Sequence, residues 1–102
     1  MKYRTLPRFE ADYRALSSAE RGKFRGALRE FIVAAAAYES SPGHFVWPKS
    51  LRVERLTGSG VMAMTWSFSG PDGRATFQFE TVGGEMFVVW RRVGRHHIYQ
   101  QP

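Results

Sequence analysis

Residues 91–102 concentrate side chains that could hold anions and transfer protons, and this segment contains no acidic residue. Arg91, Arg92 and Arg95 carry planar guanidinium groups, which suit phosphate oxygens and base edges better than the point charge of a lysine. His96 and His97 add two imidazoles, and an ordinary histidine titrates near about 6.5, so it can transfer protons at neutral pH. Together these residue types indicate chemistry on a polyanion, with nucleic acid as the first expectation.

Two further side chains are candidates for the same chemistry. Arg74 follows a turn signal at residues 70–73, and the pattern places it on the outward side of a strand with Thr76 and Gln78. It could clamp a phosphate, although an ordinary solvated cation would have the same sequence context. Tyr99 could stack on a nucleic-acid base or could anchor the tail on the sheet.

The sequence does not distinguish His96 from His97. Neighbouring residues in an extended segment point in opposite directions, so the two imidazoles are expected to face different surroundings. The alternative is a solvated pair of histidines without a function. We expect no metal site, because these two histidines are adjacent, His44 is remote and no carboxylate pattern accompanies them. No other cofactor is expected.

A second group of cations is expected to bind the RNA backbone. Its members are Lys49, Arg52, Arg55, Arg91 and Arg92. The first three could hold RNA phosphates or could form a solvated edge, and the sequence favours neither reading. Arg91 and Arg92 are expected on opposite faces of one strand, so that one could face RNA while the other lies on the helix side or at an edge.

Composition restricts the classes of protein to which the chain can belong. It has 102 residues with a net charge of +6, and arginine outnumbers lysine by 12 to 3. Such a charge indicates a polyanion or an acidic protein as the partner. Cysteine is absent, which excludes a disulfide scaffold, a thiol nucleophile and a cysteine-based zinc or iron–sulfur site.

The same composition bears on localisation and on the number of domains. No apolar stretch approaches the roughly 20 residues that a membrane-spanning helix needs. The first residues also lack the apolar core of a secretory signal. We therefore expect a single domain over residues 1–102, located in the cytoplasm and without a membrane partner.

The elements that must position these side chains divide into a helical front and a strand-rich back. Alternation over residues 2–6 predicts a short strand. Apolar spacing predicts a helix over residues 7–16, and a capping box formed by Ser17 and Glu20 opens a longer helix that extends to about residue 37. The two helices are expected to form a hairpin.

From residue 51 onward the apolar period changes to two, which predicts strands. They are expected at residues 51–57, 61–69, 74–81 and 86–93. The short, glycine-rich turns between them favour an antiparallel meander. We therefore predict an α+β fold in which the N-terminal strand and the helical hairpin pack on one face of an antiparallel four-strand sheet. The other face is expected to stay open, with a basic rim suited to RNA.

Three short motifs carry a resemblance to a known family. They are Leu-Arg-Val-Glu-Arg-Leu-Thr-Gly at 51–58, Asp-Gly-Arg-Ala-Thr-Phe at 72–77, and Val-Val-Trp-Arg-Arg-Val-Gly at 88–94, and a late histidine and tyrosine follow them. With the order of the elements, they resemble the RelE/ParE superfamily of toxins from bacterial type II toxin–antitoxin systems. The resemblance covers nearly the whole chain by element order, and its specific part is residues 51–99.

For a RelE-like member, the resemblance implies a ribosome-dependent mRNA endonuclease that uses no metal. The ribose 2′-OH attacks the adjacent phosphorus and the 5′-oxygen leaves, which gives a 2′,3′-cyclic phosphate. Such chemistry needs a base, an acid and cations that stabilise the charge on the phosphate. The resemblance also implies a cognate acidic antitoxin as a partner, together with mRNA and rRNA on the ribosome.

The resemblance also assigns roles to particular residues. Arg74 matches the family's arginine after the glycine of the hairpin strand. Arg95, or else His96, matches the cationic position that follows the last strand. Tyr99 matches the tyrosine that stacks on the substrate base. His96 or His97 matches a histidine that acts as an acid or base in some relatives.

One departure from the RelE pattern lies in the strand predicted at residues 61–69. Typical RelE members carry lysines where this chain has Ala63 and Thr65. A tail histidine could replace the missing base. The same departure fits ParE-type members, which poison DNA gyrase, and it fits a non-catalytic member whose only partner is an acidic antitoxin.

Overall fold

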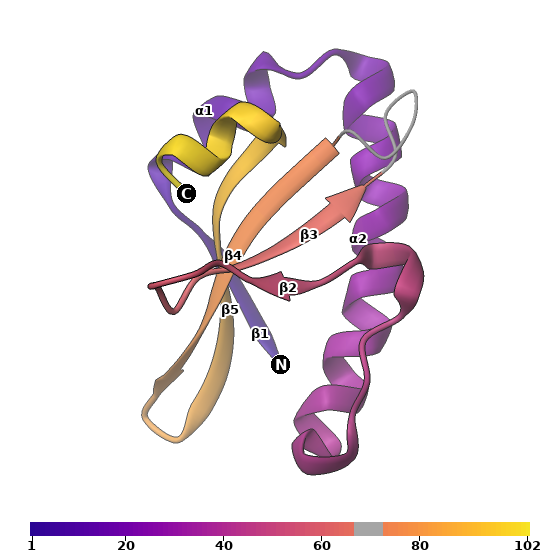
Figure 1. Cartoon of the computed structure of the whole chain (residues 1–102), viewed down its shortest axis with the longest axis vertical. Coiled ribbons are helices and arrows are strands. Elements are labelled where there is room, and N and C mark those ends of the chain that lie inside the picture. The colour runs from indigo at the N-terminus through magenta and orange to yellow at the C-terminus, as the bar shows by residue number, and fades with distance from the viewer. Residues whose placement is uncertain (67–72) are drawn as a thin grey trace.

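A computed structural model describes residues 1–66 and 73–102. Within these residues the chain forms two α-helices, three short 3-10 helices and one five-stranded sheet (Figure 1). This mixed architecture confirms the predicted α+β class. Neither α-helix in the described ranges is long and apolar enough to cross a membrane.

The strands lie in the order β1-β5-β4-β3-β2 across the sheet. The antiparallel part contains β3 (Met62–Trp66), β4 (Gly73–Val82) and β5 (Glu85–Arg95), and the two-residue strand β2 (Glu54–Arg55) is added to it at the β3 side. At the opposite edge, β1 (Lys2–Thr5) pairs with β5 and runs parallel to it. The prediction that the N-terminal strand packs on one face of a four-strand antiparallel sheet is therefore wrong, because β1 is hydrogen-bonded to β5 as the fifth strand of the sheet.

Two helices cover one face of this sheet. They are α1 (Pro7–Ala15) and α2 (Ser18–Ser40), joined through Leu16 and Ser17. The predicted capping box is confirmed, because the Ser17 hydroxyl accepts from the backbone N–H of Glu20 and the Glu20 carboxylate accepts from that of Ser17. These bonds satisfy two N–H groups that the helix leaves without an internal partner.

Aromatic side chains fill the space between α2 and the sheet. Phe24 contacts Trp66 and Trp90 with ring centroids 5.6 and 6.0 Å apart. Phe31 contacts Phe77 and Trp90 at 5.0 and 4.9 Å. Each such pair contributes about 0.5–1.5 kcal/mol beyond the burial of its area. The cluster thus fixes α2 against the inner face and leaves the outer face of the sheet for other contacts.

The side chains of β4 alternate as the sequence predicts. Ala75 and Phe77 are buried in the core between the sheet and the helices. Arg74, Thr76 and Gln78 therefore lie on the outer face.

Residues 51–57 were predicted as a strand, and this prediction is wrong for most of the segment. Lys49–Leu51 forms a 3-10 helix, η2, and only Glu54–Arg55 pairs with the sheet. Between them Arg52 adopts a left-handed backbone conformation with φ of 45°. Such a residue breaks the extended conformation that a strand requires. Of the strand predicted at 61–69 and the turn at 70–73, residues 67–72 lie outside the described ranges.

The tail after β5 folds back as a 3-10 helix, η3 (His96–Gln100), instead of continuing as an extended segment. Gly94 allows this close approach, because a Cβ atom there would lie 3.1 Å from the Ile98 side chain and 3.2 Å from the ring of His97. Ile98 is fully buried and holds η3 against the sheet. Figure 1 shows η3 beside the upper ends of β4 and β5, near α1.

Arg91 and Arg92 lie at a register shift in β5. The pairing with β4 shifts by one residue between Thr76 and Phe77. Trp90 and Val93 both belong to the core although they are three residues apart. Regular alternation would have directed one of the two intervening arginines into the core, whereas the bulge keeps both out of it.

The outer face of the sheet is not open along its whole length, contrary to the prediction. The Thr76 hydroxyl donates a hydrogen bond to the Pro102 carbonyl oxygen at 3.0 Å. Thr76 is fully buried, and Val89 is almost fully buried although it lies outside the core cluster. The tail lies against the outer face at Thr76, so the exposed part of that face is smaller than expected.

Candidate functional site

A polar cavity of about 180 Å³ lies on the outer face, where β2, β3 and β4 meet η3. The residues that line it are Arg52, Glu54, Thr65, Arg74, His96 and Tyr99. Pockets that enclose a drug-sized ligand usually have about 300–1,000 Å³. The cavity is therefore suited to one small group, such as a phosphate with its neighbouring atoms.

Strand pairing builds the floor of this cavity. Thr65 on β3 and Arg74 on β4 are directly opposed in the register. Glu54 on β2 pairs with Ala63, so its side chain projects from the same face as that of Thr65. The left-handed turn at Arg52 ends η2 immediately before β2 and brings the Arg52 side chain to the same cavity.

The 3-10 helix η3 provides the opposite wall. Residues three apart eclipse one another in a 3-10 helix, so His96 and Tyr99 lie on the same side of η3. Their ring centroids are 4.7 Å apart and their planes are inclined by 55°. His97 lies on another side of η3 and does not line the cavity. Of the two histidines that the sequence left undecided, the structure thus brings only His96 to Arg74 and Tyr99.

The backbone around Arg74 is fixed by its neighbours. The indole N–H of Trp66 donates to the Arg74 carbonyl oxygen at 3.1 Å, and the Arg74 guanidinium donates to the Gly73 carbonyl oxygen at 3.0 Å. A Cβ atom on Gly73 would lie 2.5 Å from the Trp66 ring, so only glycine fits before Arg74. The start of β4 is therefore held by packing against a buried tryptophan.

The electrostatic environment of Tyr99 combines both signs of charge. Burial raises the pKa of Tyr99 above its ordinary value of 10.0. The Arg74 guanidinium lowers this pKa and the Glu54 carboxylate raises it, each through its charge and through hydrogen bonding to the phenol. The net shift is upward, so the phenol is protonated at neutral pH and can donate a hydrogen bond.

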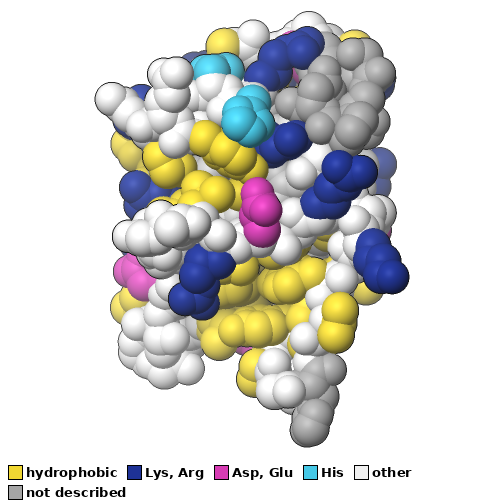
Figure 2. Space-filling view, viewed as in Figure 1, with side chains coloured by type: hydrophobic (Ala, Val, Ile, Leu, Met, Phe, Trp, Pro, Cys, Tyr) yellow, Lys and Arg dark blue, Asp and Glu magenta, His cyan; other side chains and the backbone are white. Residues whose placement is uncertain are grey.

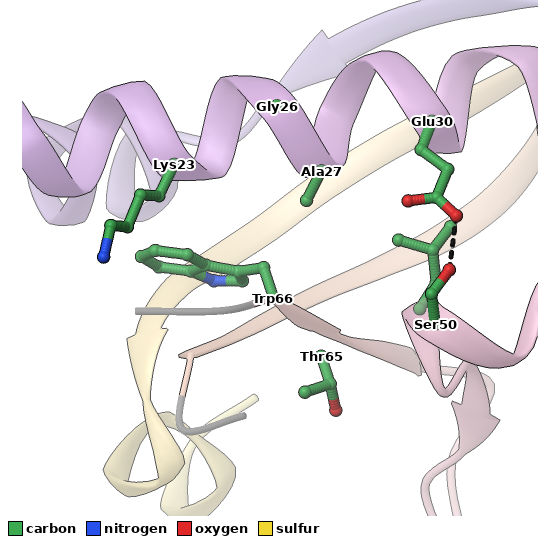
Figure 3. A pocket seen from close by; sticks show the side chains of 8 residues that line it. Lys23, Gly26, Ala27, Glu30, Ser50, Thr65 and Trp66 are labelled. Atoms are coloured by element: carbon green, nitrogen blue, oxygen red, sulfur yellow. Dashed lines mark hydrogen bonds between the residues drawn. The ribbon is translucent and has the colours of Figure 1, made fainter. Parts of the chain in front are cut away.

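A second depression, of about 390 Å³, lies between α2 and η2 (Figure 3). Thr65 lines both this depression and the polar cavity. Figure 3 shows Lys23 close to the indole of Trp66 at one end and a hydrogen bond from Ser50 to Glu30 at the other. The Ser50–Glu30 bond ties η2 to α2, and it therefore supports the segment that leads into the polar cavity.

The other two predicted catalytic residues lie elsewhere. Arg95 and His97 line a separate depression of about 200 Å³ together with Asp12 and Glu20. This depression lies between the junction of the two α-helices and the end of β5. The structure does not bring Arg95 or His97 into the polar cavity.

The predicted RNA-binding cations also divide into groups. Arg52 lines the polar cavity, whereas Lys49 and Arg55 are exposed outside it. Arg91 donates to the Pro102 carbonyl oxygen at 3.2 Å and to the Gln78 side chain at 3.1 Å. Arg92 is paired with Asp12. Arg91 and Arg92 are thus bonded to other groups of the same chain. Arg91 holds the tail, and Arg92 holds α1.

Cationic side chains nevertheless gather near the cavity. In the view of Figure 2, histidine side chains lie at the upper end of the molecule, where Figure 1 shows η3, with lysine and arginine side chains around them. A broad hydrophobic area occupies the lower part of the same view. A strand of RNA approaching this side would meet its positive charges beside η3.

Two cavity residues, Glu54 and Thr65, were not singled out from the sequence. Glu54 is an acidic residue inside a basic motif, two positions after Arg52. In the strand predicted at residues 51–57 this spacing would have put both side chains on one face, whereas in the structure the left-handed turn at Arg52 brings the two to the same cavity. Thr65 was noted only as a position where the RelE pattern has a lysine, and its pairing with Arg74 shows that it faces the cavity.

The cavity contains the groups that proton transfer at a phosphodiester requires. The carboxylate of Glu54 can accept a proton, and the imidazole of His96 can donate one when protonated. The guanidinium groups of Arg52 and Arg74 can hold phosphate oxygens and stabilise negative charge on them. Among residues 1–66 and 73–102, no three histidine, aspartate or glutamate side chains come together in the way that a metal ion would need.

Comparison with known proteins adds no identification. No protein-family model, curated protein or solved structure matches this chain. The geometry of the polar cavity is therefore the basis on which a function can be proposed.

Proposed function

We propose that this chain is the toxin of a bacterial type II toxin–antitoxin module, a RelE-like member of the RelE/ParE superfamily that cleaves mRNA on the ribosome. One observation carries the proposal. Arg74, His96 and Tyr99, which were expected to be catalytic from the sequence, line one cavity together with Glu54 and Arg52. The cavity joins three separate segments of the chain, namely residues 52–54, the start of β4 and η3, and the proximity of these segments is not a consequence of sequence spacing.

In the proposed reaction, Glu54 accepts the proton of a ribose 2′-OH. The 2′-oxygen forms a bond to the adjacent phosphorus while the bond from phosphorus to the 5′-oxygen breaks. His96, in its protonated form, donates its proton to the leaving 5′-oxygen. The products are a 2′,3′-cyclic phosphate and a 5′-hydroxyl, and no metal takes part. General acid and base groups each contribute typically about 10²–10⁴-fold to a rate.

The remaining cavity residues hold the substrate. Arg74 and Arg52 bind the phosphate oxygens, whose charge grows as the 2′-oxygen attacks. Tyr99 donates a hydrogen bond from its protonated phenol or presents its ring to the base. Because the ring centroids of Tyr99 and His96 are 4.7 Å apart, a base stacked on Tyr99 would lie next to the proposed proton donor.

Glu54 also offers a replacement for the base that is missing relative to the RelE pattern. The positions where typical RelE members carry lysines are occupied by Ala63, which is fully buried, and by Thr65, which lines the cavity without a charge. Neither side chain can act as a base at neutral pH. The Glu54 carboxylate lines the same cavity and takes the role of base that a tail histidine was expected to fill.

The charge of the whole chain supports the proposed partners. A net charge of +6 favours association with the phosphate backbone of mRNA and rRNA. The same charge favours an acidic antitoxin, whose binding would neutralise part of it.

The test uses the purified protein and ribosomes programmed with a defined mRNA, with cleavage mapped by primer extension. We expect cuts that leave a 2′,3′-cyclic phosphate, and a rate that falls by at least about 100-fold in His96→Ala. His97→Ala is the matched control, because His97 neighbours His96 in the chain but lines a different depression. Intact mRNA in the presence of the wild-type protein would contradict the proposal.

A second candidate function is inhibition of DNA gyrase, as in ParE-type members. The absence of lysine at residues 63 and 65 favours it. Growth arrest on expression without any new mRNA ends, together with reduced supercoiling by purified gyrase, would support this candidate. Unchanged supercoiling would exclude it.

A further inference from the structure

The tail that follows η3 is held by side chains of β4 and β5. Arg92 donates from Nη1 to the Gln101 carbonyl oxygen at 3.0 Å. Arg91 and Thr76 both donate to the Pro102 carbonyl oxygen, at 3.2 and 3.0 Å. These bonds fasten the segment directly after Gln100, where η3 ends.

Arg92 is itself held by a carboxylate of α1. Its Nε lies 2.6 Å from Asp12 Oδ2, and its Nη2 lies 3.2 Å from Asp12 Oδ1. This two-point geometry fixes the orientation of the guanidinium plane as well as its position. The same Oδ2 accepts the backbone N–H of Val93 at 3.2 Å, so Asp12 is also fixed to β5.

This ion pair is more buried than the pair formed by Arg4 and Glu80. The Arg92 and Asp12 side chains are only 12% and 19% exposed, whereas those of Arg4 and Glu80 are 52% and 34% exposed. Exposed pairs are screened by water and contribute little. Removing one partner of a largely buried, hydrogen-bonded pair has a larger effect, because the other partner is left without its bonds.

We propose that Asp12 is a positioning residue for the polar cavity. It orients Arg92, Arg92 holds the Gln101 carbonyl group, and this bond keeps the last turn of η3 closed. His96 and Tyr99 thereby stay in contact within the cavity. The catalytic consequence rests on the proposed function, whereas the structural link between α1 and η3 does not depend on it.

The length of η3 is the reason why such a link is needed. A five-residue 3-10 helix has poor hydrogen-bond geometry and is weak by itself. Gly94 and Ile98 hold its beginning and its middle. Its last turn is closed by the bond from the Gln101 N–H to the Ile98 carbonyl oxygen, at 3.1 Å. Tyr99 lies inside this turn, so an open turn would release the Tyr99 ring from His96.

The first test of this proposal needs no catalytic activity. NMR spectra of the full chain would report the ring-proton shifts of His96, which depend on the nearby Tyr99 ring, and the exchange rate of the Gln101 amide. In Asp12→Asn we expect the His96 ring signals to move and the Gln101 amide to exchange at least about 10-fold faster. Glu80→Gln is the matched control, because it breaks an exposed ion pair far from η3 and is expected to change neither.

The second test measures kcat and KM for mRNA cleavage on programmed ribosomes. A displaced catalytic group costs up to about 100-fold in rate, so we expect kcat of Asp12→Asn to fall by about 10–100-fold with KM little changed. In a Tyr99→Ala background the same substitution is expected to have no further effect on kcat. A merely structural role would instead lower kcat in both backgrounds.

Arg92→Lys is the second variant, in case Asp12→Asn does not fold. It keeps the positive charge opposite Asp12. A single ammonium group, however, cannot reproduce the two bonds to the Asp12 carboxylate together with the bond to the Gln101 carbonyl oxygen. It is expected to show the same changes at His96, at Gln101 and in kcat.

Unchanged His96 signals and unchanged Gln101 exchange in both variants would overturn the proposal. Changes in these signals with kcat at the wild-type value would overturn it as well. A wild-type protein that does not cleave mRNA would contradict the proposed function alone, and the NMR comparison would then decide whether Asp12 positions η3.

Discussion

Tyr99 lies between Glu54 and Arg74, and these two neighbours act on its pKa in opposite directions. Burial sets the upward shift, Glu54 adds to it and Arg74 reduces it. A protonated phenol is thus maintained beside a carboxylate and a guanidinium. At the scale of single residues, the cavity combines a carboxylate, an imidazole and two guanidinium groups around one aromatic ring.

This arrangement predicts the titration of Tyr99 in two variants. Glu54→Gln removes a negative charge and is expected to lower the pKa of Tyr99, whereas Arg74→Ala removes a positive charge and is expected to raise it. NMR titration with labelled tyrosine would measure both shifts. Shifts of the same sign in the two variants would contradict the placement of Tyr99 between these groups.

The raised pKa of Tyr99 also links protonation to stability. Its folded-state pKa lies above the ordinary value of 10.0, so the native state holds the phenolic proton more tightly than the unfolded chain does. The contribution is complete below pH 10 and is lost as the pH rises through the folded-state pKa. As the pH rises above 10, the unfolding free energy of Tyr99→Phe is therefore expected to fall less than that of the wild type, as measured by denaturant titrations.

Gly73 gives a second prediction at the residue scale. A Cβ atom there would lie 2.5 Å from the Trp66 ring, so Gly73→Ala forces buried groups apart. Such overpacking costs about 1–3 kcal/mol of unfolding free energy. Gly60→Ala is the matched control, since a Cβ at that position would meet no atom within 4 Å. Urea unfolding of both variants measures the difference, and equal losses would contradict the tight packing at Gly73.

At the scale of elements, η3 depends on the burial of one side chain. Ile98 is fully buried, and it lies between His96 and Tyr99 in the chain. It therefore connects the stability of the tail to the position of the cavity wall.

Ile98→Ala is expected to lower the unfolding free energy by about 2–5 kcal/mol, because it removes buried methyl groups and leaves a void. Under mild conditions in which the variant remains folded, we expect it to cleave mRNA more slowly than the wild type, because η3, which carries His96 and Tyr99, has lost its buried anchor. Val46→Ala is the control, because Val46 is 82% exposed. A loss for Ile98→Ala no larger than that for Val46→Ala would contradict the role of this anchor.

At the scale of the whole molecule, the net charge of +6 predicts salt-sensitive binding to RNA. For single-stranded RNA, each phosphate contact contributes about −0.7 to the slope of log affinity against log salt concentration. Arg52→Gln with Arg74→Gln should flatten this slope by about 1.4 if each side chain holds one phosphate. Arg4→Gln should leave it unchanged, because Arg4 pairs with Glu80 away from the cavity. Fluorescence anisotropy with a short RNA would provide the slopes.

Local patterns were sufficient for much of the architecture. The capping box at Ser17 and the alternation of Ala75 and Phe77 with Arg74 depend on neighbours in the chain, and the structure confirms both. They could be predicted because helix caps and strand faces follow from periods of a few residues.

The sequence by itself determined which residue types could act on a polyanion, and it placed Arg74 on the outer face. Only the tertiary structure decided that His96 and not His97 joins Arg74, that Glu54 completes the cavity, and that Arg92 turns to Asp12. These contacts depend on the register of the sheet, on a bulge in β5 and on a tail that folds back. Each of these features is set by packing between segments that are distant in sequence. The spacing of residues within one segment carries no information about such packing.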